Sequence, residues 1–153
     1  MSKLVYQISL WGGCAEYLLD SLQVVQNKAA RFVTRKGRYT HIKELLTNCG
    51  WLSVRQLVFF HSVMLLHKVV RSGYPEYIYN RINIDYPYHT RLAASKAMRL
   101  TAVNQVRLQV ASRSFIPRAC KSYNRIPADL RQSQSIRQFR SQLKIWVRDN
   151  VNV

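Results

Sequence analysis

The side chains that could carry out a reaction are few in this chain and lie far apart. Only seven residues are acidic, and no two of them are adjacent or one residue apart, so no local carboxylate pair resembles a two-metal site. No serine stands in a glycine-flanked elbow, and no glycine-rich phosphate loop is present. The sequence therefore predicts that the domain is not an enzyme by itself and uses no cofactor.

Metal binding is not indicated either. The three cysteines, Cys14, Cys49 and Cys120, are widely spaced, whereas zinc motifs usually contain a close cysteine pair. His61 and His67 are six residues apart, about 240° around a helix, so they face different ways. We interpret both histidines as structural and predict no metal site. The odd cysteine count and the lack of a secretory signal favour an intracellular location, in the nucleus or the cytoplasm.

Anion binding is the chemistry that the chain does offer. Lys and Arg total 24, Asp and Glu total 7, and the net charge is +17. No acid interrupts residues 21–43, 86–128 or 130–148, which argues against an ordinary surface of mixed charge. A field this one-sided opposes compaction unless a polyanion neutralises it. Nucleic acid is the first candidate for that partner, and anionic lipid is the second.

Two groups of cations are the candidate nucleic-acid-binding residues. Part of the first group repeats at steps of three and four residues, which places those side chains along one side of a helix. The first group is Lys28, Arg31, Arg35, Lys36, Arg38 and Lys43, and the second is Arg91, Lys96, Arg99, Arg107, Arg113 and Arg118.

Membrane binding is not expected. A helix that lies on a membrane needs a large exposed apolar face beside its basic residues. The apolar stripes of this chain are expected to be needed for the core, and no apolar stretch reaches the length that spans a bilayer.

Tyrosines and arginines alternate in YPEYIYNRINIDYPYHTR, residues 74–91. Exposed aromatic rings beside arginine can stack on unpaired bases. The alternative, which we prefer at this point, is that the tyrosines cover the edge of the core and hydrogen-bond through their hydroxyl groups.

Helical periodicity dominates the elements that must position these side chains. It predicts helices over 15–36, 40–48, 54–71 and 112–124, and a last helix that begins near 136. Capping-box pairs, Ser53 with Gln56 and Ser135 with Gln138, mark two of the starts. In the first helix the stripe expected to face the core is Leu18, Leu22, Val25, Ala29 and Phe32, widened by Leu19 and Val33.

The segment after residue 80 is less regular. Met98 and Leu100 alternate with Arg99, and residues 106–110 alternate in the same way, so the two runs could pair as a hairpin, with a helix as the alternative. The predicted fold is thus a mainly α-helical single domain over residues 1–153, with a seam near 80–90 and room for one small β-hairpin.

Eight short motifs follow one another along the chain: LWGG (10–13), LQVVQNKAARFVT (22–34), WLSVRQ (51–56), GYPEYI (73–78), HTR (89–91), SF (114–115), YNRIPADLR (123–131) and SIRQFRSQLKIWV (135–147). In this order they resemble the region that follows the reverse-transcriptase domain in LINE-type (non-long-terminal-repeat) retrotransposons of the jockey and chicken-repeat kind. That family usually has Trp and Leu where this chain has Tyr123 and Ile126. We interpret YNRIPADLR as a structural junction, with Tyr123 packed inside and Arg125 and Arg131 facing solvent or phosphate.

The resemblance implies a non-catalytic part of an RNA-copying polymerase. In that family the catalytic aspartates and the endonuclease lie outside the matched region, so the chain is expected to be a truncated or standalone remnant. Its cations would hold RNA or DNA, with the template RNA preferred. The alternatives are a protein-interaction or scaffolding domain, whose charge aids solubility or docking, and a remnant without a present function.

Overall fold

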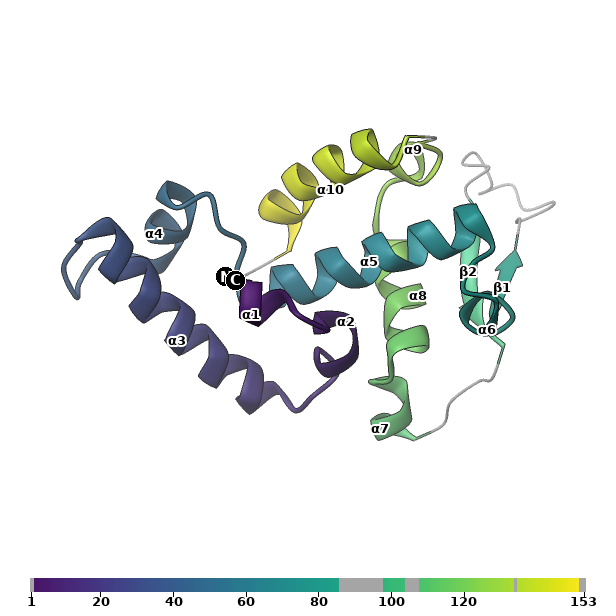
Figure 1. The fold of residues 1–153 in the computed structure, drawn as a ribbon, viewed down its shortest axis with the longest axis horizontal. Coiled ribbons are helices and arrows are strands. Elements are labelled where there is room, and N and C mark those ends of the chain that lie inside the picture. Colours follow the sequence, from purple (N-terminus) through teal and green to yellow (C-terminus); the bar gives the residue numbers. More distant parts are fainter. Residues whose placement is uncertain (1, 86–97, 104–107, 134, 152–153) are drawn as a thin grey trace.

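The computed structural model describes residues 2–85, 98–103, 108–133 and 135–151. The fold is mainly α-helical with one small antiparallel sheet, as the sequence predicts. The long helix α5 (Val54–Ser72) runs through the middle of the molecule (Figure 1). Four helices pack against it: α2 (Ile8–Trp11), α3 (Glu16–Thr34), α8 (Phe115–Arg125) and α10 (Ile136–Asn150).

Shorter elements connect these helices. They are α1 (Ser2–Val5), α4 (Ile42–Asn48), α6 (Glu76–Tyr79), β1 (Ile82–Asp85), β2 (Arg99–Ala102), α7 (Gln109–Ser112) and α9 (Ala128–Arg131).

Local signals in the sequence set the ends of α5. The predicted capping box is present, since the Ser53 side chain accepts a hydrogen bond from the Gln56 amide and the Gln56 side chain accepts one from the Ser53 amide. Gly73 ends the helix at a φ of 69°, a conformation that glycine adopts without strain. Between these caps, apolar side chains occur on most sides of α5. The helix is therefore surrounded by other elements, and most of its side chains are buried.

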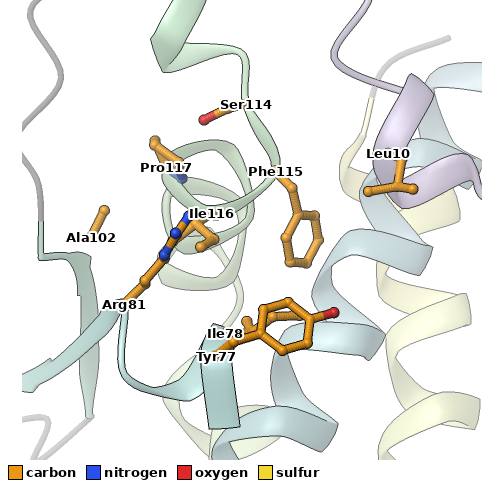
Figure 2. Close-up of a pocket in the computed structure, with 9 residues that line it drawn as sticks. All are labelled: Leu10, Tyr77, Ile78, Arg81, Ala102, Ser114, Phe115, Ile116 and Pro117. Atoms are coloured by element: carbon orange, nitrogen blue, oxygen red, sulfur yellow. The ribbon is translucent and has the colours of Figure 1, made fainter. Parts of the chain in front are cut away.

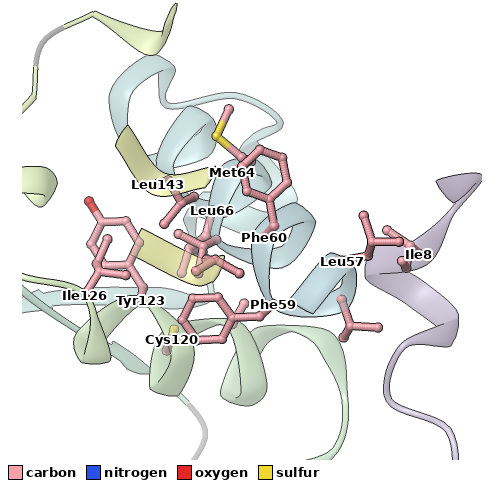
Figure 3. Close-up of a cluster of buried hydrophobic side chains, with 14 of the residues drawn as sticks. Ile8, Leu57, Phe59, Phe60, Met64, Leu66, Cys120, Tyr123, Ile126 and Leu143 are labelled. Atoms are coloured by element: carbon pink, nitrogen blue, oxygen red, sulfur yellow. The ribbon is translucent and has the colours of Figure 1, made fainter. Parts of the chain in front are cut away.

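One hydrophobic cluster surrounds α5 (Figure 3). Phe59 and Leu66 of α5 belong to it together with Tyr123 of α8 and Leu143 of α10. Ile78, Ile82 and Leu100 join the same cluster, so residues on both sides of positions 80–90 share one core.

His67 is a polar member of this core. Its Nδ1 lies 3.1 Å from the Tyr123 hydroxyl, and its ring stacks on Phe139 with 3.7 Å between ring centroids. Burial, aided by the charge of Arg71, lowers the pKa of His67 to about 4. His61, on another face of α5, is half-buried, and burial lowers its pKa as well. Both histidines pack in or beside the core, in keeping with a structural role.

The stretch YNRIPADLR joins α8 to β2 and α9. Tyr123 is fully buried, as predicted. The Asn124 side chain accepts a hydrogen bond from the Leu100 amide at 3.0 Å and donates one to the Leu100 carbonyl at 2.7 Å. The prediction that Arg131 faces solvent or phosphate is wrong. Its side chain is half-buried and donates to the carbonyls of Ile126 and Met98 at 3.1 and 2.7 Å. It serves the junction because those carbonyls need a donor.

The predicted hairpin has a different partner strand. Residues 99–102 do form a strand, but β2 pairs with β1, with Ile84 opposite Leu100. Residues 109–112 are helical, and residues 104–107 lie outside the described part. Ile82 of β1 is buried in the core, so the pairing is fixed by a contact that local alternation does not reveal.

The predicted core stripe of α3 is correct only at Leu19, which is buried, and at Leu22, which packs against the main core. Leu18, Val25 and Phe32 are exposed, Phe32 by 86%. Beside Leu19, the buried face is lined by Gln26, Asn27 and Ala30, which the stripe did not include. Polar packing causes this rotation: Gln26 donates to the Leu52 carbonyl at 2.7 Å, and the Val54 amide donates to the Gln23 side chain at 2.8 Å.

Two glycines allow the N-terminal segment to lie close to α5 and α8. A Cβ on Gly12 would come within 2.6 Å of Val58 Cγ1, and a Cβ on Gly13 within 2.2 Å of the Arg113 carbonyl oxygen. Any larger residue in this part of LWGG would push these elements apart.

Candidate nucleic-acid interface

The first group of cations lies at the carboxyl end of α3 and in the segment that follows it. Lys28 is on α3, Arg35 and Arg38 come after it, and Lys43 is in the first turn of α4. All four residues are exposed. Among the described residues, ion pairs are confined to Lys36–Glu44, Arg55–Glu16 and Arg55–Asp20, so none of the four is neutralised by a carboxylate.

The other two members of this group are less available. Lys36 forms an ion pair with Glu44, and its charge and hydrogen bond hold the pKa of that carboxyl below its usual value. Arg31 is half-buried, and its Nε is shielded from solvent. The structure thus leaves four of the six predicted cations free to meet an anion.

A small hydrophobic core, separate from the main one, joins α3 to α4. Ala30, Leu45 and Leu46 are its buried residues. His41 precedes α4, and its Nδ1 accepts a hydrogen bond from the Lys43 amide at 3.3 Å. These contacts fix Lys43 relative to the end of α3.

A cavity of about 440 Å³ lies between α3, α4 and the end of α10. Its wall includes Lys43 from α4 and Arg148 from α10, two cations more than a hundred residues apart in the sequence. Asn27 and His41 add groups able to hydrogen-bond to an anion, and Asp149 is the acid in the wall. The cavity therefore connects the first group of cations to α10.

A further row of cations runs along α10, and we term it the α10 ridge. Its members are exposed and stand three, four and four residues apart, on one side of the helix away from the buried Phe139 and Leu143. They are Arg137, Arg140, Lys144 and Arg148. Our candidate set omitted this row, although the same helical spacing was visible in the sequence and could have identified it.

The second group of cations is less coherent. Arg99 on β2 and Arg113 after α7 are exposed, while Arg91, Lys96 and Arg107 lie outside the described residues. The β-sheet is at the opposite end of the molecule from α3 and α4 (Figure 1). Arg99 on this sheet therefore does not belong to the patch around the carboxyl end of α3.

Arg118 does not belong to the exposed set. Its Nη2 donates to the Ser9 carbonyl at 2.6 Å, and its Nε and Nη1 are shielded from solvent. Burial lowers the pKa of its guanidinium accordingly. This correction has a packing reason: Arg118 ties α8 to the N-terminal segment beside Gly12.

The tyrosines of residues 74–91 divide into two kinds. Tyr79 packs against the core, as we preferred for the whole set. Tyr74 and Tyr77 do not: 76% and 70% of their surface is exposed. Tyr86 and Tyr88 lie outside the described residues.

The exposed stripe of α3 adds an apolar surface beside the first group of cations. Its exposed side chains include Leu18, Val25 and Phe32, seven residues apart on one side of the helix. We expected this stripe to be needed for the core, and on that ground we set a membrane surface aside; the exposure of the stripe removes that ground.

Other kinds of site find no support in the part of the chain that the structure describes. There, no three His, Cys, Asp or Glu side chains are grouped to hold a metal ion, and no helix has the length and apolarity needed to cross a bilayer. Comparison of the chain with protein-family models, curated proteins and solved structures finds no match, so its resemblance to the retrotransposon region stays a prediction.

Proposed function

We propose that this domain binds nucleic acid non-catalytically, through phosphate contacts. The observation that carries the proposal is the set of exposed cations on α3, α4, the segment between them and α10 that pair with no described carboxylate; two of them, Lys43 and Arg148, line one cavity. A net charge of +17 on 153 residues repels itself, and a polyphosphate backbone relieves that repulsion. RNA is preferred over DNA only on the strength of the retrotransposon resemblance.

The test is a salt series. The affinity of the whole chain for a single-stranded RNA and for a DNA duplex is measured at increasing salt concentration. For single strands, log affinity should fall linearly with log salt, by about 0.7 per phosphate contact. Lys28→Ala and Arg35→Ala should each reduce that slope by about 0.7 or less. Lack of binding up to about 10 μM protein in low salt would sink the proposal.

The chain supplies a matched control for these substitutions. Arg55 is also an exposed cation, but its guanidinium contacts Glu16 at 3.0 Å and Asp20 at 2.8 Å. Because its charge is already paired, Arg55→Ala should leave the salt slope nearly unchanged. Equal losses from Arg55→Ala and Lys28→Ala would mean that overall charge, and not a local surface, governs binding.

The second candidate function is protein interaction, and the exposed stripe of α3 favours it. Its exposed members Leu18, Val25 and Phe32 repeat every seven residues, as in a helix-pairing seam, and the exposed Ala29 lies on the same side; Leu22 packs against the main core. The occupant that we consider is a second copy in antiparallel orientation, which keeps the basic carboxyl end of one α3 away from that of the other. Light scattering should then give a dimer that Val25→Asp converts to a monomer. A monomeric wild-type chain that binds phosphatidylserine vesicles would instead favour a membrane surface.

A further inference from the structure

A second cavity, distant in sequence from the α3 cations, lies between α2, α6, β2 and the first turn of α8 (Figure 2). Its volume is about 340 Å³, and its walls are mostly apolar and aromatic. Such a space has the size and the lining of a small-ligand site. It takes no part in the phosphate interface described above.

An exposed aromatic residue stands at the rim of this cavity. Tyr77 is 70% exposed, and its ring lies near Phe115, which also lines the cavity (Figure 2). A tyrosine that served only to cover the core would bury its ring, as Tyr79 in the same helix does in part. The two rings offer the apolar faces on which a flat aromatic ligand stacks.

One cation belongs to the same wall. The Arg81 side chain extends towards Ile116 and Pro117 at the edge of the cavity (Figure 2). It forms no ion pair with a described carboxylate. Arg113, which is exposed, immediately precedes Ser114 in the wall. A ligand that fits here therefore carries negative charge next to a flat ring.

The start of α8 is compatible with the same charge. Ser114 is the N-cap residue, but its hydroxyl donates to the Ala111 carbonyl at 2.7 Å and accepts no hydrogen bond from the helix. The Phe115 and Ile116 amides at this end thus have no side-chain cap, and the helix dipole favours an anion there. This feature supports the charge of the ligand and does not by itself define the site.

From the rings and the cation together, we infer that the cavity receives an unpaired base of a single-stranded nucleic acid. The base stacks on Tyr77, and Arg81 contacts the adjoining phosphate. The inference rests on the proposed function and deepens it, because it gives the domain a reason to distinguish single strands from duplexes, whose bases are already stacked.

The experiment compares two exposed tyrosines of the same segment. Tyr77 lines the cavity, while Tyr74, which is exposed to a similar degree, does not. Tyr77→Ala should weaken binding of a single-stranded RNA about 5- to 150-fold, the usual effect of losing one stacked base. Tyr74→Ala should leave the affinity unchanged, and Tyr77→Phe should retain it because the ring remains.

A spectroscopic readout checks the stacking itself. The RNA carries one 2-aminopurine, whose fluorescence changes when the base leaves its own strand and stacks on protein. The wild-type chain and Tyr74→Ala should give this change, and Tyr77→Ala should lose it. Arg81→Gln should weaken binding of the single strand while a duplex, which keeps its bases, is bound as before. Adenosine monophosphate serves as a separate arm, since its competition for the cavity would identify a free nucleotide as the ligand.

The outcomes separate this inference from the function beneath it. If the wild-type chain binds neither RNA nor duplex, the proposed function fails, and the inference fails with it. If it binds both with a steep salt slope, but Tyr77→Ala and Tyr74→Ala behave alike, only the base site is overturned. Circular dichroism of each variant checks that the fold is intact, which the exposure of both tyrosines leads us to expect.

Discussion

At the scale of single residues, His67 couples the stability of the core to pH. Its buried ring contacts Tyr123 and stacks on Phe139, and its pKa of about 4 lies below the ordinary value of 6.5. The unfolded chain therefore binds a proton at a higher pH than the folded chain does. The stabilisation from the neutral ring is complete above pH 6.5 and is lost as the pH falls from 6.5 towards 4.

The first prediction follows from this difference in pKa. The free energy of unfolding should fall by about 3 kcal/mol as the pH drops through that window, given about 1.4 kcal/mol per pKa unit. Urea unfolding between pH 7 and pH 3.5 measures it. His67→Phe should flatten the dependence, whereas His61→Gln should keep most of it, since His61 is only half-buried. An unchanged pH dependence in His67→Phe would contradict the assignment.

Also at this scale, the contacts that a basic side chain makes determine whether it is available to bind an anion. Lys28 and Arg55 are both exposed, but only Arg55 is paired with carboxylates. Arg118 and Arg131 donate to backbone carbonyls inside the fold. Residue type and spacing could not separate these cases, because Glu16, Asp20, Ser9 and Met98 are each more than 30 residues away from the arginine that they contact.

At the scale of elements, α3 presents one apolar side to α4 and another to solvent. The second prediction compares them at a protein concentration low enough to keep the chain monomeric. Leu45→Ala, in the small core between α3 and α4, should cost about 2–5 kcal/mol of stability in urea unfolding. Phe32→Ser, on the exposed stripe, should change it by no more than about 0.5 kcal/mol. A large loss from Phe32→Ser would restore the buried stripe that the periodicity predicted.

The third prediction concerns the α10 ridge. A variant with Arg140, Lys144 and Arg148 all replaced by Ala should reduce the salt slope for single-stranded RNA by up to about 2, at 0.7 per lost contact. Its fold should persist, because these side chains point away from the core contacts of Phe139 and Leu143. The matched control is Gln138→Ala with Gln142→Ala, exposed positions on the same helix that carry no charge. A slope like that of the wild type in the triple variant would remove α10 from the interface.

At the scale of the whole molecule, the charge of +17 sets the response to polyanions. Self-repulsion destabilises the folded chain, and both salt and a bound polyphosphate reduce it. The fourth prediction is that single-stranded RNA at about 100 times its Kd raises the free energy of unfolding by about 2.7 kcal/mol. Thermal unfolding with and without RNA measures the stabilisation. An uncharged polymer at equal mass is the control, and an equal effect from that polymer would point to crowding instead of binding.

The sequence by itself determined the helical fold and the charge. Helix starts such as Ser53 with Gln56, helix ends such as Gly73, and the absence of acids from long spans depend only on neighbouring residues. Local hydrogen bonds and local counts are sufficient for these properties, which is why the helices over 16–34, 54–72 and 136–150 lie where the pattern predicts them.

Only the tertiary structure decided which faces are covered and which cations are free. The side of α3 that packs is the one on which Gln23 and Gln26 hydrogen-bond to Val54 and Leu52. The strand that pairs with β2 is the one whose Ile82 is buried in the core. Arg148 joined Lys43, and Tyr77 joined Phe115, at cavities made by chain folding. Periodicity reports how polar each side of a helix is; it does not report which side finds a partner, because that depends on contacts between residues far apart in the chain.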